Sequence, residues 1–131
     1  MLRGAGLRAG DLRVPLKRIG TFGVEVSKQA FRGHKDPVTG VPWKRLSKRY
    51  AIAKRRKGYD PLPMTRTARL RRSIHRLSIG ARHVEWGTNV KYGPPHQYGG
   101  RMPQRRFLGL SKNDTAEITA IVNRWIMRSR P

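Results

Sequence analysis

Apolar residues recur every three or four positions near both ends of the chain, which is the spacing of one face of a helix. The first such stretch runs from Asp11, a suitable N-cap, to Phe31. The second follows Ser111 and extends to about Met127. The pattern predicts two amphipathic helices, with inner positions at Leu12, Leu16, Ile19, Val26 and Ala30 in the first and at Ile118, Ile121, Val122, Trp125 and Ile126 in the second.

Local signals add detail to both helices. Ser111 and Asp114 resemble a capping box, with aspartate in place of the usual glutamate or glutamine. Gly20 and Gly23 lie inside the first helix, where each glycine costs about 1 kcal/mol relative to alanine. That cost indicates either close packing against the helix or a bend within it.

The middle of the chain shows the two-residue period of strands. Residues 73–79 and 82–88 predict an antiparallel hairpin that turns at Gly80 and Ala81. Its alternating apolar positions are Leu77, Ile79, Val84 and Trp86. The preceding segment, residues 65–74, is expected to begin as a helical turn and then straighten, with Leu70 and Ile74 facing inward.

Turn residues fill positions 34–43, and we expect Trp43 to pin this loop to the core. Residues 44–57 carry eight basic side chains, and Leu46, Tyr50 and Ala53 keep helical spacing, which predicts a short basic helix. The fold class is therefore α+β, a small antiparallel sheet with a central hairpin packed by N- and C-terminal amphipathic helices. We expect one domain at 11–128, a flexible basic arm at 1–10 and a basic tail at 129–131.

Charge is the strongest compositional signal. The 131 residues include 30 Lys and Arg against 7 Asp and Glu, for a formal net charge of +23. Such a chain repels itself unless a polyanion or an acidic protein relieves the repulsion, and charge does not choose between the two. The basic helix is either a solvated face or a contact for DNA or an acidic partner. Its candidate contact residues are Lys44, Arg45, Lys48, Arg49, Lys54, Arg55, Arg56 and Lys57.

Catalytic and metal-binding patterns do not emerge from the sequence. The carboxylates are scattered, and most suit caps or turns that precede proline. His34, His75, His83 and His96 have no common metal-ligand spacing, although His75 and His83 would face each other across the hairpin. There is no cysteine, no phosphate-binding glycine loop and no apolar run near the roughly 20 residues of a membrane span. We therefore expect no enzyme activity, no cofactor or metal, and no membrane contact.

The stretch at residues 84–111 is dense in prolines, glycines, aromatic residues and arginines. It indicates a shaped surface between a hairpin and a capped helix. The candidate subunit or partner interface is Tyr92, His96, Tyr98, Arg101, Arg105 and Arg106. Within this set we expect the rings to shape the loop and the arginines to contact a neighbour, so that glutamate at Arg105 and Arg106 would block assembly without unfolding the chain. The predicted structural core is Trp43, Trp86, Phe107, Leu108 and Trp125.

An ordered set of short motifs resembles the phage virion morphogenesis proteins, or tail completion proteins, of Mu-like and related tailed phages. After the first helix come Asp36-Pro-Val-Thr-Gly40, Trp43 and Leu46-Ser47. Thr67-Ala-Arg-Leu70-Arg-Arg-Ser73-Ile74 follows, with Ala68 where the family usually has glycine. The set ends with Trp86-Gly87-Thr88, Lys91-Tyr92, His96-Gln97-Tyr98-Gly99 and Pro103-x-Arg105-Arg106-Phe107-Leu108-Gly109. The resemblance covers residues 11–128.

The resemblance implies a structural virion protein at the head–tail junction, assembled in the host cytoplasm and carried in the neck or tail. Such subunits form rings, often sixfold, that complete or terminate the tail between a connector and the tail tube. The implied partners are further copies of the chain, neighbouring neck, connector and tail-tube proteins, and DNA in the channel. The alternative is a non-specific nucleic-acid-binding protein that uses its basic surface.

Overall fold

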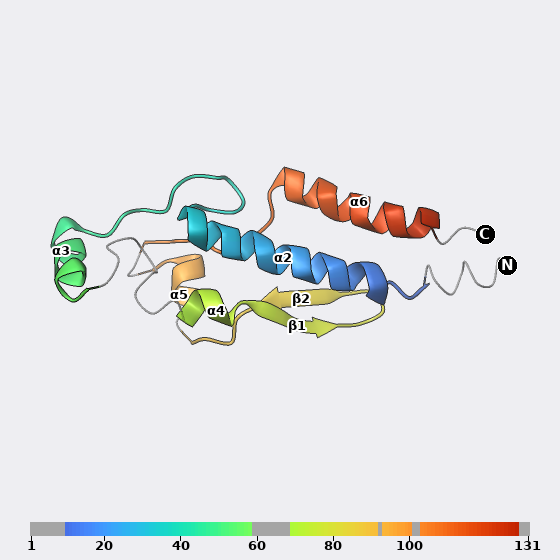
Figure 1. The fold of residues 1–131 in the computed structure, drawn as a ribbon, viewed down its shortest axis with the longest axis horizontal. Helices are drawn as coiled ribbons and strands as arrows, with labels where there is room; N and C mark the ends of the chain where they lie inside the picture. Colours follow the sequence, from blue (N-terminus) through green and yellow to red (C-terminus); the bar gives the residue numbers. More distant parts are fainter. Residues whose placement is uncertain (1–9, 59–68, 92, 101–102, 129–131) are drawn as a thin grey trace.

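The computed structural model describes residues 10–58, 69–91, 93–100 and 103–128. The elements in chain order are α2 (Arg13–Gly33), α3 (Lys48–Arg56), α4 (Arg69–Ser73), β1 (His75–Ile79), β2 (Val84–Gly87), α5 (Gly93–Tyr98) and α6 (Lys112–Arg128). In Figure 1, α2 runs along the middle of an elongated molecule, with α6 on one side and the hairpin on the other. The predicted α+β class is confirmed. The expected basic tail, and the expected arm apart from Gly10, lie outside the described residues.

Both long helices begin and end near the predicted residues. The N-cap position of α2 is Leu12 and not Asp11, but Asp11 Oδ1 still accepts a hydrogen bond from the Arg13 N–H at 3.2 Å. The capping box of α6 is confirmed. The Asp114 N–H donates to Ser111 Oγ at 3.1 Å, and the Ser111 N–H donates to Asp114 Oδ2 at 2.9 Å. The shorter aspartate therefore performs the reciprocal role that glutamate usually has.

The hairpin packs directly on the glycines of α2. A Cβ atom at Gly20 would lie 2.9 Å from Val84 Cγ2, and one at Gly23 would overlap the indole of Trp86. Close packing is thus the reason for these two glycines. The proposed pairing of His75 with His83 is wrong, because His75 pairs with Gly87 and His83 lies beyond the end of β1, where its carbonyl accepts from the Gly80 N–H.

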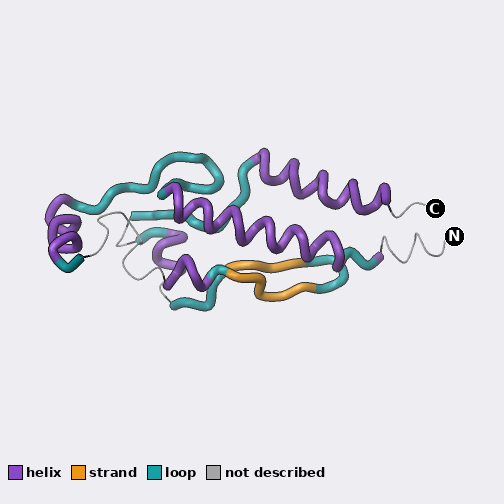
Figure 2. Tube along the Cα trace, viewed as in Figure 1, coloured by secondary structure: helices purple, strands orange, loops and turns teal. Residues whose placement is uncertain are grey.

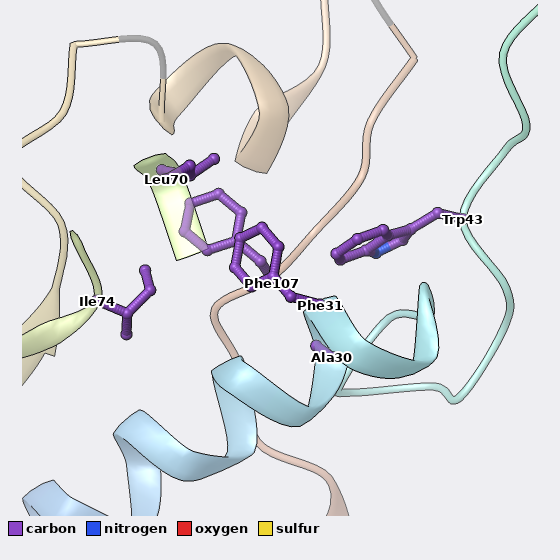
Figure 3. Close-up of a cluster of buried hydrophobic side chains, with 6 residues drawn as sticks. All are labelled: Ala30, Phe31, Trp43, Leu70, Ile74 and Phe107. Carbon is purple, nitrogen blue, oxygen red and sulfur yellow. The ribbon is translucent and has the colours of Figure 1, made fainter. Parts of the chain in front are cut away.

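The main core gathers at the C-terminal end of α2. Figure 3 shows the rings of Phe31 and Phe107 between Leu70 and Trp43. The Phe31 centroid lies 5.4 Å from those of both Trp43 and Phe107, a spacing typical of attractive aromatic pairs. The cluster is Ala30, Phe31, Trp43, Leu70, Ile74 and Phe107, with Val24, Val90 and Leu108 packed against it. The inward placement of Leu70 and Ile74 is therefore confirmed.

Two of the predicted core tryptophans lie elsewhere. Trp86 is half-buried beneath α2, and Trp125 is half-buried on α6. No residue of α6 is fully buried, although all five residues of its predicted apolar stripe are half-buried. The physical reason is that α2 is the only element with which α6 makes extensive contact in the described part of the chain. A single helix covers only part of the apolar stripe of α6.

Irregular segments concentrate at the core end of the molecule, as Figure 2 shows. The basic helix α3 is shorter than the predicted 44–57, because Ser47 caps it by accepting a hydrogen bond from the Tyr50 N–H at 3.2 Å. The stretch expected to be only a loop contains the short helix α5. As expected, the turn of α4 straightens into β1.

Candidate functional site

Two segments far apart in sequence, residues 34–44 and 103–109, hold each other in what we call the clasp. The indole Nε1–H of Trp43 donates to the Arg106 carbonyl at 2.8 Å. In return, Arg105 Nε donates to the Lys44 carbonyl at 2.8 Å. The guanidinium of Arg106 contacts Asp36 Oδ2 through Nε and Nη2, each at 2.9 Å. These contacts bring together two of the motifs that carry the family resemblance.

Asp36 organises one side of the clasp. Its Oδ1 accepts hydrogen bonds from the Val38 N–H at 2.7 Å and the Thr39 N–H at 3.3 Å, which fixes the turn before Gly40. Burial alone would raise the pKa of Asp36, but the hydrogen bond from Arg106 and those from the two backbone N–H groups outweigh it. The net effect is a pKa below the ordinary value for aspartate.

A lowered carboxyl pKa makes the clasp sensitive to acid. Asp36 binds a proton more weakly in the folded chain than in the unfolded chain, so its contribution to stability is complete above about pH 4 and is lost as the pH falls through the folded pKa. We expect Asp36→Asn to be less stable than wild type at pH 7, and the gap to narrow below pH 4. Urea denaturation at several pH values measures it. A gap that stays constant down to pH 2 would contradict this role.

Gln97 links the short helix α5 to the clasp. Its Oε1 accepts from the N–H groups of Phe107 at 3.1 Å and Leu108 at 3.0 Å, and its Nε2 donates to the Leu108 carbonyl at 2.8 Å. A side-chain amide suits this position because it carries both a donor and an acceptor, as an extended backbone requires. Gln97 belongs to the His96-Gln97-Tyr98-Gly99 motif but is not among the predicted site residues. The sequence does not show which backbone groups its side chain contacts.

The predicted interface residues differ widely in their exposure to solvent. Arg105 is only 5% exposed, so its guanidinium lies inside the clasp and not on the surface where a neighbour was expected. Arg106 is half-buried against Asp36. Tyr98, expected to shape the loop from within, is instead 78% exposed. Tyr92 and Arg101 lie outside the described residues.

His96, which lies on α5, is next to Arg105 of the clasp. Its side chain is half-buried, and its carbonyl accepts a hydrogen bond from the Arg105 N–H at 2.8 Å. Burial, and then the positive charge of Arg105, lower the pKa of His96. Burial also lowers the pKa of Arg105. The pair therefore supports the clasp from within, which agrees with a shaping role for His96.

Most of the basic side chains predicted to contact DNA or an acidic partner are exposed. Lys54 is the exception, because it is only 5% exposed and thus cannot form part of an open basic face. The remaining candidate contacts are exposed: Lys44, Arg45, Lys48, Arg49, Arg55, Arg56 and Lys57.

Among the described residues, seven large apolar side chains are exposed, and four of them lie toward the two ends of the long axis; the other three are Val41, Leu77 and Tyr98. Val14, in the first turn of α2, and Met127, in the last turn of α6, are more than half exposed. Both helix ends lie at the same end of the molecule (Figure 1). At the opposite end, α3 exposes Tyr50 and Ile52. We call these pairs the terminal patch and the α3 patch, each defined by the end of the molecule where it lies; Tyr50 and Ile52, two positions apart, lie on different sides of α3.

Across residues 10–58, 69–91, 93–100 and 103–128, no group of three or more His, Asp or Glu is placed to hold a metal ion. Within the same ranges, no helix is long and apolar enough to cross a membrane.

Comparison with known proteins identifies the chain's family. The model of the phage virion morphogenesis family matches residues 1–127. The chain belongs to the phage virion morphogenesis family. No curated protein and no solved structure matched it. Family membership gives the chain a structural role in phage virion assembly and implies contact with other virion components. It is also consistent with a protein that is not an enzyme.

Proposed function

We propose that this family member forms a closed ring at the head–tail junction of a tailed phage, where it completes or terminates the tail and joins it to the head. The observation that carries the proposal is the separation of the terminal patch from the α3 patch. A ring needs two different, complementary surfaces on each subunit, because a heterologous contact repeats until rotation closes it. An elongated subunit with an apolar patch toward each end meets that requirement.

The exposed residues in each patch suit a contact with a second copy of the chain. Met127 is 60% exposed and Ile52 is 52% exposed, so both keep apolar surface in contact with water until another subunit covers them. Covering that surface is favourable. The half-buried stripe of α6 continues from the terminal patch and includes Ile118, Ile121 and Val122. The proposed ring has sixfold symmetry and stacks against connector and tail-tube proteins.

Disulfide crosslinking tests this arrangement with little background, because the chain contains no cysteine. The variant carrying both Met127→Cys and Ile52→Cys, assembled into tails and then oxidised, is expected to give a ladder of crosslinked subunits. Its largest rung reports the number of subunits in the ring. Each single variant is expected to remain uncrosslinked, because a head-to-tail contact does not bring like positions together.

A matched control replaces the α3 cysteine with Leu77→Cys, which puts the thiol at an exposed position on β1, away from the α3 patch. The pair Met127→Cys and Leu77→Cys is expected to give no ladder. Dimers from a single variant would indicate a two-fold contact and contradict the proposed ring. Equal ladders from both pairs would show that the crosslinks are nonspecific and would count against the two patches.

A further inference from the structure

Two basic hollows lie next to each other around α4. The first has a volume of about 540 Å³ and is lined by Arg69, Arg72, Ser73, His75, Asn89, Val90 and Lys91. The second, of about 300 Å³, lies between α4 and the last turns of α2, and is lined by Lys28, Arg32, Arg71 and Arg72. Arg72 lines both, so the hollows form one continuous basic surface. This surface is separate from α3, where the sequence had predicted the basic contact.

Positive charge in these hollows is little neutralised. The lining residues of both hollows, among the described part of the chain, include no carboxylate. Glu25 does reach Arg32 at 2.8 Å, at the edge of the second hollow. Three further acidic residues form ion pairs elsewhere: Asp11 with Arg13, Asp36 with Arg106, and Glu117 with Arg124. An anion entering either hollow therefore meets more lysine and arginine side chains than carboxylates.

The backbone around the first hollow is held in place by internal hydrogen bonds. Ser73 Oγ contacts both the Leu70 carbonyl at 2.6 Å and Thr88 Oγ1 at 2.5 Å, which ties α4 to the segment after β2. Thr88 Oγ1 also accepts from the Val90 N–H at 3.0 Å. His75 Nδ1 lies 2.6 Å from the Ser73 carbonyl and donates to it, because a carbonyl oxygen carries no proton. The hollow is thus formed before any ligand arrives, while Arg72 and Lys91 remain exposed.

We infer that the α4 hollows bind successive phosphates of a nucleic-acid backbone. The planar guanidinium of arginine matches a phosphate with two parallel hydrogen bonds, and arginine is the commonest lining residue here. Each strand of a duplex carries one charge about every 3.4 Å along the helix axis, and the shared residue Arg72 lets successive phosphates contact both hollows. No Phe, Tyr or Trp ring lines the hollows among the described residues, which favours contact with the backbone over stacking on bases. Binding is therefore sequence-independent. The inference does not depend on ring formation.

Fluorescence anisotropy with a labelled 20-base-pair duplex tests this site on the full chain. The variant Arg72→Ala/Lys91→Ala is expected to bind about tenfold more weakly at 100 mM salt. Its slope of log affinity against log salt is expected to fall by about 2, one for each lost phosphate contact. The control Lys48→Ala/Arg49→Ala removes the same charge from exposed positions on α3 and is expected to lose less than threefold.

Three results would overturn the site. Equal losses in the two variants would mean that net charge, and not the α4 hollows, determines binding. Affinity independent of salt would exclude phosphate contact. Competition by poly-glutamate as strong as that by unlabelled duplex at equal charge would show that the hollows accept an acidic protein surface instead. Circular dichroism of each variant keeps a loss of binding distinct from a loss of fold.

Discussion

Replacing Trp43 with alanine is expected to lower the free energy of unfolding by about 3–5 kcal/mol, as large truncations of buried aromatic residues do. Trp43 is only 5% exposed and packs edge-on against the ring of Phe31, at one side of the core cluster (Figure 3). It also joins the two halves of the clasp, because its indole N–H donates to the Arg106 carbonyl. Alanine removes both the packing and the hydrogen bond. Urea denaturation followed by far-ultraviolet circular dichroism measures the loss.

Two companion variants separate these contributions. Trp43→Phe keeps an aromatic ring but removes the donor to Arg106, and its expected loss is about 1–3 kcal/mol. Trp125→Ala removes a half-buried ring from α6 and is expected to cost less than Trp43→Ala. If Trp43→Ala and Trp125→Ala cost the same, Trp43 does not hold the core in the way described.

Introducing valine at Gly23 is expected to destabilise the chain by about 3 kcal/mol, at the upper end of the usual range for overpacked sites. Even a Cβ at this position overlaps atoms of the Trp86 six-membered ring, and valine adds two methyl groups beyond it. The indole cannot withdraw without separating β2 from α2, which it joins. Thermal and urea denaturation of the purified variant measure the effect.

A double-mutant cycle shows whether Trp86 is the cause. Gly23→Ala is expected to destabilise the wild-type chain. The energetic cost of the overlap with Trp86 is expected to exceed the roughly 1 kcal/mol that alanine gains over glycine in a helix. In a Trp86→Leu background the overlap is relieved, and the same substitution is expected to become neutral or stabilising. Gly10→Ala, whose Cβ meets no atom within 4 Å, is the control and is expected to have little effect. Destabilisation that persists in the Trp86→Leu background would refute the explanation.

Local signals predicted the elements of this fold well. The capping box at Ser111 and the inward positions Leu70 and Ile74 depend on neighbours within a few residues, so sequence spacing was enough to find them. The choice between close packing and bending at Gly23 depends on Trp86, sixty-three positions away. The spacing of residues within one helix carries no information about a contact of that range.

The site was harder to predict for the same reason. Arg105 and Arg106 looked like surface arginines, because a charged pair beside prolines usually faces solvent. In the fold both arginines bind residues more than sixty positions earlier. Arg105 donates to the Lys44 carbonyl, and Arg106 pairs with the Asp36 carboxylate. Glutamate at both positions therefore tests the clasp and not a contact with a neighbour. The motif residues Asp36, Trp43, Gln97, Arg105 and Arg106 hold the subunit together, whereas the exposed apolar ends carry no motif.

The central claim, a closed ring at the head–tail junction, is tested most directly by electron cryo-microscopy of the neck of assembled virions. We expect the density to show copies of the chain in a closed ring. In each contact, the end carrying Val14 and Met127 should meet α3 of the next subunit. Absence of the chain from the neck, or a contact that pairs like ends of two subunits, would contradict the proposal.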